Sequence, residues 1–141
     1  MLAKRIQSKV ESLLGVSDFR WKPLPNGVYV LNLHRIGDVA SSKLDPNVYS
    51  CSAEKLQQHL TYLKQYFDII SLSELIDLVS NKSRADGKYL VVTFDDGYRD
   101  NFELAYPILK SLKIPALFFI ATGLIENAEL PWWDKVAYLI Q

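Results

Sequence analysis

Residues 89–97 read Tyr89-Leu90-Val91-Val92-Thr93-Phe94-Asp95-Asp96-Gly97, and this stretch decides the fold. Its first six residues are β-branched, aromatic or aliphatic, which predicts a strand over 89–94. Apolar residues fall on both alternating faces, as is typical of a strand covered on both sides in a parallel α/β sheet. Two aspartates then follow at the carboxyl end of the strand, where the functional residues of such folds collect. The stretch therefore predicts both the fold class and the place of a site.

The segments around this strand alternate between strand and helix. Further strands are predicted over 28–33, 67–70 and 116–120, and the first and last of these are expected to be buried. One helix is predicted from the cap Ser52 through Leu63, and a second from the capping-box pair Ser71 and Glu74 through residue 79. Two more are predicted over 101–112, with a kink or boundary at Pro107, and over 133–140. Residues 37–47 are expected to form a loop. Strands alternating with helices at this spacing predict a parallel α/β fold.

The composition narrows the classes of protein that fit. A chain of 141 residues suits one domain, and its 16 Lys and Arg balance its 16 Asp and Glu. This balance removes the basic footprint of most nucleic-acid-binding proteins, so no nucleic-acid partner is expected. The single cysteine, Cys51, excludes an internal disulfide and any multi-cysteine metal site. The two histidines, His34 and His59, limit every metal or acid–base hypothesis.

The N-terminal segment is predicted to form an amphipathic helix that ends at Gly15, because its apolar residues recur at helical spacing (Leu2, Ile6, Val10, Leu13 and Leu14). The helix either packs on the domain or lies on a membrane surface. No apolar run of signal-peptide or membrane-spanning length is present, so a cytoplasmic location is expected. We divide the chain into residues 1–26, a helix and linker, and residues 27–141, the main domain.

Asp95 and Asp96 are adjacent carboxylates that repel each other at the end of a buried strand. They are tolerable if one binds a metal and the other is hydrogen-bonded, or if one takes up a proton. Gly97 allows the sharp turn that lets both side chains face one cleft. The alternative is an Asp-Gly turn that closes the strand. His34, at the end of the strand over 28–33, either faces the same cleft or bonds to a loop backbone.

The run 93–101 (Thr-Phe-Asp-Asp-Gly-Tyr-Arg-Asp-Asn) resembles the first motif of the polysaccharide deacetylases, carbohydrate esterases with a NodB-homology domain. Residues 115–123 look like the next strand of that family, and Pro131-Trp132-Trp133-Asp134 recurs in one of its branches. Residues 33–36 are similar to its Tyr-His-Arg segment, although Leu33 replaces the usual tyrosine. The resemblance runs from about residue 28 to the C-terminus. It implies an irregular (β/α) barrel, of which this chain forms an incomplete part.

The resemblance also implies roles for three residues. Asp95 corresponds to the general base, and Asp96 to a ligand of a divalent metal, usually zinc, which two histidines of a later His-Ser/Thr-x-x-His motif complete. His34 matches a histidine that serves as general acid in branches that partly deacetylate poly-N-acetylglucosamine. The implied reaction is metal-dependent hydrolysis of N-acetyl groups on a carbohydrate, with release of acetate.

The sequence departs from this pattern because no histidine follows Asp96. One carboxylate is a poor zinc site, since zinc takes about four ligands, of which about three come from the protein. We therefore expect this chain by itself to be inactive, either as a fragment or as a degenerate relative that binds a glycan or a partner protein without catalysis. A phosphotransfer enzyme fits less well, because the haloacid dehalogenase pattern has its aspartates two apart and no Gly-rich phosphate loop is present.

Four side chains near the motifs are candidates for substrate contact. Tyr98 and Arg99 follow the two aspartates directly and are placed to line the cleft. Trp132 and Trp133 either stack on sugar rings or form the apolar start of the last helix.

Structural roles are expected for the remaining polar residues. Asp100 or Asn101 is predicted to cap the helix that follows the acidic motif. His59, between two apolar positions of its helix, is predicted to be a partly buried structural histidine. Cys51 has no histidine spaced to activate it, so it is not expected to be a nucleophile.

Overall fold

A computed structural model of the protein describes residues 23–81, 85–125 and 129–140. One parallel sheet holds four strands, and β5 lies between β1 on one edge and both β4 and β6 on the other. β1 pairs with β5 along its whole length, whereas β4 pairs with the start of β5 and β6 with its end. The bounds are β1 Gly27–Leu33, β4 Asp68–Ile69, β5 Lys88–Phe94 and β6 Leu117–Phe118. The predicted parallel α/β fold is confirmed.

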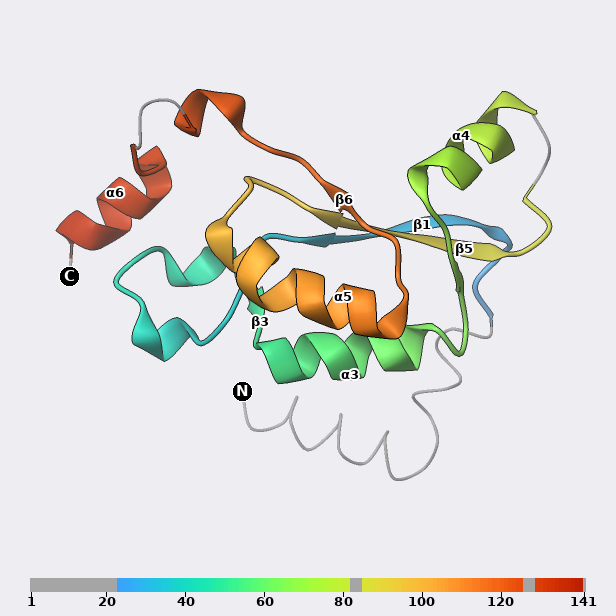
Figure 1. Ribbon diagram of the computed structural model, residues 1–141, viewed down its shortest axis with the longest axis horizontal. Helices are drawn as coiled ribbons and strands as arrows, with labels where there is room; N and C mark the ends of the chain where they lie inside the picture. The colour runs from blue at the N-terminus through green and yellow to red at the C-terminus, as the bar shows by residue number, and fades with distance from the viewer. Residues whose placement is uncertain (1–22, 82–84, 126–128, 141) are drawn as a thin grey trace.

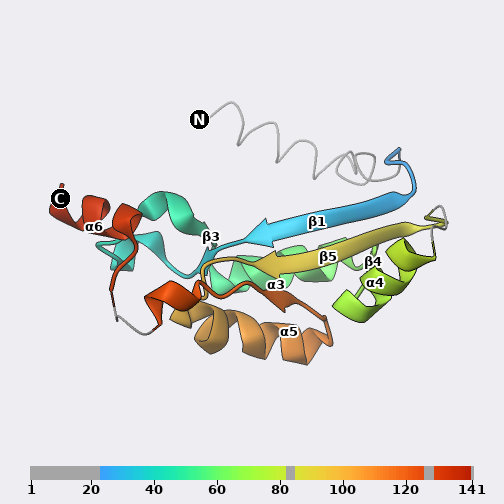
Figure 2. The same ribbon diagram turned by 90° about the horizontal axis from the view of Figure 1, so that it is seen from above.

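Helices connect these strands and extend beyond them. α3 and α5 lie side by side against one face of the sheet (Figure 1). α4 lies near the start of β5, whereas α6 lies beyond the end to which β1 and β5 point (Figure 2). The bounds are α3 Ala53–Leu63, α4 Leu72–Ser80, α5 Tyr106–Leu112 and α6 Trp132–Leu139. The carboxyl ends of β1 and β5 therefore lie at the same end of the molecule as α6.

The predicted helix starts are built as expected. The Ser52 hydroxyl accepts a hydrogen bond from the Lys55 N–H at 3.3 Å. Ser71 and Glu74 form a reciprocal capping box: the Ser71 hydroxyl accepts from the Glu74 N–H, and the Ser71 N–H donates to the Glu74 carboxylate at 2.7 Å. Both caps satisfy N–H groups that the first helical turn leaves without partners.

The core lies between the sheet and the two helices α3 and α5. Its buried side chains come from these elements and the loops between them: Leu33, Ile36, Leu56, Leu60, Leu63, Phe67, Leu90, Val92, Phe94, Ala105, Leu109 and Ile114. On the opposite face of the sheet, Val28 and Val30 of β1 are exposed, while Val91 and Thr93 of β5 are buried. The sheet thus has one packed face and one face that is open along β1.

One prediction for the second half needs correction. The strand expected over 116–120 is only Leu117–Phe118, and Phe118, Phe119 and Ile120 are exposed rather than buried. No strand among the described residues pairs with the outer edge of β6 and covers these apolar side chains.

The helix predicted over 101–112 is confirmed, together with its boundary near Pro107. It begins as a π-helical turn, Asn101–Ala105, and continues as α5, with Pro107 in the first turn of the α-helix. Proline has no N–H to donate, so it is tolerated at a helix start and interrupts the hydrogen-bond pattern of the preceding turn.

His59 is exposed on α3, so the predicted partly buried position is wrong. The buried stripe of this helix is narrow, formed by Leu56, Leu60 and Leu63, and His59 falls outside it.

The segment 37–47 is mostly loop, as predicted, with two short 3-10 helices, Val39–Ser41 and Pro46–Val48. A two-stranded parallel sheet that was not predicted flanks it, formed by β2 (Arg35–Ile36) and β3 (Tyr49–Cys51). The helix predicted over residues 2–14 lies outside the described residues. Among the helices that are described, each is too short or too polar to span a lipid bilayer.

Candidate active site

The acidic turn forms the end of β5. The Asp95 N–H donates to the Leu33 carbonyl at 2.8 Å, which carries the β1–β5 ladder one residue beyond the strand. Asp96 and Gly97 then both adopt left-handed backbone angles, with φ of 70° and 69°. A Cβ on residue 97 would lie 3.1 Å from the Ile120 side chain. Gly97 permits the sharp turn, as predicted, and Asp96 shares the strained conformation, which aspartate tolerates better than most residues.

His34 and Asp95 meet across the ends of two adjacent strands. The His34 Nε2 atom lies 3.9 Å from Asp95 Oδ2, and both side chains are about one third exposed, at 38% and 34%. Solvent or a ligand can therefore reach both groups. The backbone of His34 is held at both ends, because its N–H donates to the Ser50 hydroxyl at 2.9 Å and its carbonyl accepts from the Asn101 amide at 2.6 Å. The structure thus brings together the two residues predicted as base and acid.

Asn32 is a neighbour of Asp95 that the sequence reasoning missed. Its Nδ2 atom donates to Asp95 Oδ2 at 3.0 Å, and the Thr93 hydroxyl donates to Asn32 Oδ1 at 2.9 Å. Asn32 and Thr93 are direct cross-strand partners in the β1–β5 register. A polar residue near the carboxyl end of an otherwise apolar strand is the signal that could have found it.

Arg35 forms a second network behind the site. Its guanidinium lies between the rings of Tyr49 and Tyr98, 4.4 and 4.7 Å from their centroids, and its Nε donates to Asp100 at 2.8 Å. Asp100 also accepts the Ile36 N–H at 3.0 Å. The prediction that Asp100 or Asn101 caps the next helix is therefore wrong, because Asp100 makes no capping bond and both side chains instead hold the segment 34–36.

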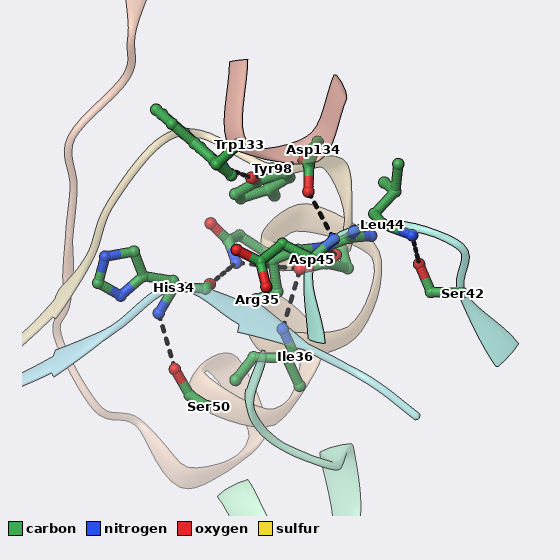
Figure 3. A network of polar contacts seen from close by, with 12 residues as sticks. His34, Arg35, Ile36, Ser42, Leu44, Asp45, Ser50, Tyr98, Trp133 and Asp134 are labelled. Atoms are coloured by element: carbon green, nitrogen blue, oxygen red, sulfur yellow. Dashed lines mark hydrogen bonds and ion pairs between the residues drawn. The ribbon is translucent and has the colours of Figure 1, made fainter. Parts of the chain in front are cut away.

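Half-buried Tyr98 and Trp133 and buried Asp134 form a cluster, called the buried cluster below, that ties α6 to the acidic turn (Figure 3). The Tyr98 hydroxyl donates to Asp134 at 2.9 Å and accepts from the Trp133 indole N–H at 2.7 Å. Asp134 is completely buried, at 0% exposure, and its other oxygen accepts the Asp45 N–H at 3.0 Å. Burial, with the hydrogen bond to Asp134 and its charge, raises the pKa of the Tyr98 phenol well above its ordinary value.

The four candidate substrate contacts have different surroundings. Tyr98 and Trp133 use their polar atoms within the buried cluster. Trp132 is 71% exposed and touches Trp133 edge to face, with ring centroids 5.7 Å apart. Arg99 is exposed and pairs with Glu103 at 2.6 Å. Of these side chains, only Trp132 offers a large open aromatic surface, and a part for any of them in substrate binding stays a prediction.

Comparisons with known proteins show which families and structures the chain resembles. The polysaccharide deacetylase family profile matches residues 82–139. The poly-β-1,6-N-acetyl-D-glucosamine N-deacetylase of Staphylococcus aureus strain MSSA476 is 32% identical over 123 residues, which cover 79% of this chain and 42% of that protein. Over the matched residues, the chain is similar to the polysaccharide deacetylases. It spans about two fifths of the length of these curated relatives.

Solved structures of similar proteins extend the comparison. The structure titled IcaB from Ammonifex degensii superimposes with a TM-score of 0.62 at 34% identity, covering 72% of this chain and 41% of the other. A de-N-acetylase from Aggregatibacter actinomycetemcomitans gives a TM-score of 0.58 at 30% identity, covering 71% and 39%. A Streptococcus pyogenes deacetylase, at 24% identity and a TM-score of 0.57, shares the fold. The matches show that the chain is part of an α/β barrel of the deacetylase type.

The residues present do not by themselves complete the metal site that the family resemblance implies. Within residues 23–81, 85–125 and 129–140, no three His, Cys, Asp or Glu side chains lie close enough together to hold a metal ion. Asp96 is half-buried beside Tyr98 and supplies one carboxylate. A protein zinc site needs about three such donors, so Asp96 would be one ligand among others that the described residues do not provide.

Proposed function

We propose that this chain forms the acid–base part of an enzyme that hydrolyses N-acetyl groups on a carbohydrate. The observation that carries the proposal is the 3.9 Å approach of His34 Nε2 to Asp95 Oδ2 at the carboxyl ends of two paired parallel strands. Two partly exposed groups that can accept and donate a proton, set side by side, are what amide hydrolysis needs. The match to the polysaccharide deacetylase family profile and the similarity to a relative named as an N-deacetylase support the choice of an N-acetylated sugar.

The proposed reaction divides two proton transfers between two residues. Asp95 removes a proton from a water molecule while the water oxygen attacks the carbonyl carbon of the acetamido group. His34, in its protonated form, then donates a proton to the nitrogen as the carbon–nitrogen bond breaks. Acetate and the protonated amino sugar are the products, and a proton that passes from Asp95 back to His34 through solvent restores both residues, so the reaction balances.

A divalent metal, with zinc as the first candidate, is part of the proposal for the enzyme as a whole. Asp96 is the residue of this chain proposed as one of its ligands. Because the described residues do not complete a site, we derive no step of the reaction through the metal.

Acetate release tests the proposal. The natural protein is incubated with a β-1,6-linked N-acetylglucosamine oligomer, and both acetate and new free amines are measured. We expect replacement of Asp95 by Asn or of His34 by Ala to lower kcat by about 100-fold or more, because general acid–base catalysis contributes roughly that factor. His59→Ala is the matched control, since His59 is exposed on α3 and should leave kcat unchanged.

Two results would contradict the proposal. Absence of acetate release by the natural protein would favour a deacetylase-like remnant that binds a glycan or a partner protein without catalysis. Acetate release that Asp95→Asn leaves intact would assign the base to another residue.

A further inference from the structure

The candidate base Asp95 has one anchored and one free carboxylate oxygen. Oδ2 accepts the hydrogen bond from Asn32 at 3.0 Å and faces His34 Nε2 at 3.9 Å. Among the described residues, nothing donates a hydrogen bond to Oδ1. The two oxygens of this carboxylate therefore have different surroundings: Oδ2 faces His34 and accepts the hydrogen bond from Asn32.

The orientation of the Asn32 amide is fixed by its two neighbours. Thr93 is buried, at 6% exposure, and its hydroxyl lies 2.9 Å from Asn32 Oδ1. If the amide were turned over, Asn32 Oδ1 would lie 3.0 Å from Asp95 Oδ2, and two acceptors would face each other without a proton between them. The Asp95 carboxylate therefore decides the orientation, and the Thr93 hydroxyl, whose other acceptor is the Leu31 carbonyl at 3.5 Å, makes its shorter bond to Asn32 Oδ1 in that orientation. Thr93, Asn32 and Asp95 thus form a directed chain of hydrogen bonds.

The backbone of the two strands makes this chain rigid. Asn32 lies opposite Thr93 in the β1–β5 register, and the Asp95 N–H continues the ladder to the Leu33 carbonyl at 2.8 Å. Asn32 is exposed on the open face of the sheet. Its bond to Asp95 is therefore not needed to fill the core, whereas a site on rigid strands needs such support to hold a reacting group in place.

We infer that Asn32, held by Thr93, is a positioning residue that anchors Oδ2 of Asp95 and presents Oδ1 as the oxygen that takes the proton. The inference rests on the proposed function, because it assigns Asp95 its atom within that reaction. Thr93 acts only through Asn32, since a buried hydroxyl cannot reach a substrate.

Kinetics of four variants of the natural protein test the assignment, with the β-1,6-linked N-acetylglucosamine oligomer as substrate. Asn32→Ala should lower kcat by roughly 10- to 100-fold with KM within about twofold, because it removes a hydrogen bond to a charged group that orients the base. Asn32→Asp keeps the size but removes the donor, and should lower kcat at least as much. Thr93→Val should lower kcat by about 3- to 10-fold, the value of one neutral hydrogen bond. Thr93→Ser keeps the hydroxyl, so its kcat should stay within about twofold of that of the natural protein.

Each contrary result has a distinct meaning. A kcat within twofold of normal for Asn32→Ala overturns the assignment and leaves the proposed function standing. A rise in KM with unchanged kcat overturns it too, because Asn32 would then contact the substrate. Equal losses for Thr93→Ser and Thr93→Val overturn the part given to the hydroxyl. If the natural protein releases no acetate, the proposed function fails, and the assignment fails with it.

Discussion

Replacing Tyr98 by Phe tests the link between α6 and the acidic turn. The substitution keeps the ring beside Arg35 but removes the hydroxyl that donates to Asp134 at 2.9 Å and accepts from Trp133 at 2.7 Å. Asp134 is fully buried and would keep only its bond from the Asp45 N–H. A hydrogen bond to a buried charge contributes about 1.5–3 kcal/mol, and the orphaned indole N–H adds about 1 kcal/mol. We therefore expect the free energy of unfolding to fall by about 2–4 kcal/mol.

Urea unfolding of the natural protein and of Tyr98→Phe, each followed by tryptophan fluorescence, measures this difference in the free energy of unfolding. Tyr106→Phe is the matched control, because Tyr106 is an exposed tyrosine on α5 and should change the free energy of unfolding by less than about 0.5 kcal/mol. If Tyr98→Phe unfolds at the same urea concentration as the control, the buried cluster does not stabilise the fold.

The same cluster predicts a dependence on pH. Burial, reinforced by Asp134, raises the pKa of the Tyr98 phenol, so the folded state favours the neutral form. The stability that this group contributes is fully present below the ordinary tyrosine pKa of about 10 and is lost as the pH rises further. Between about pH 9 and 11 the natural protein should lose more unfolding free energy than Tyr98→Phe does. Parallel losses in the two proteins would refute this reasoning.

Three further predictions concern single residues. Gly97→Ala should lower the free energy of unfolding by about 1–2 kcal/mol, because residue 97 has a left-handed backbone and its Cβ would press on Ile120. Gly27→Ala is the control: a Cβ there meets open space, so the loss in the same urea assay should be smaller. Arg35→Lys should lower the free energy of unfolding by about 1–3 kcal/mol in the same assay, because lysine cannot lie flat between the two tyrosine rings while bonding to Asp100. A loss no larger than that of an arginine-to-lysine substitution at an exposed position would contradict this prediction. Burial raises the pKa of the Cys51 thiol, so labelling by a disulfide reagent at neutral pH should be slower in the folded protein than in urea. Equal labelling rates in the two states would contradict this prediction.

The sequence was sufficient where the deciding interactions are local. The strand that ends at Phe94, the capping box of Ser71 and Glu74, and the turn at Gly97 all depend on residues within a few positions of one another. The acidic motif also predicted the place of the candidate site, because parallel strands carry their functional residues at their carboxyl ends.

Interactions between distant segments were not predictable in the same way. Asp100 has the residue type of a helix cap, but its partner Arg35 lies 65 positions earlier in the chain. Asn32 belongs to a strand that was expected to be buried, although every second residue of β1 faces the open side of the sheet. Only the register between β1 and β5 places Asn32 opposite Thr93 and beside Asp95.

The central claim is that Asp95 acts as the base and His34 as the acid. The most direct test compares an amide with an ester that has a good leaving group, because the phenolate of 4-nitrophenyl acetate departs without being protonated. On the N-acetylglucosamine oligomer, His34→Ala should lose about 100-fold or more in kcat/KM, whereas on the ester it should stay within about threefold of the natural protein. Asp95→Asn should lose activity on both substrates. Equal losses of His34→Ala on amide and ester, or full ester activity in Asp95→Asn, would contradict the account.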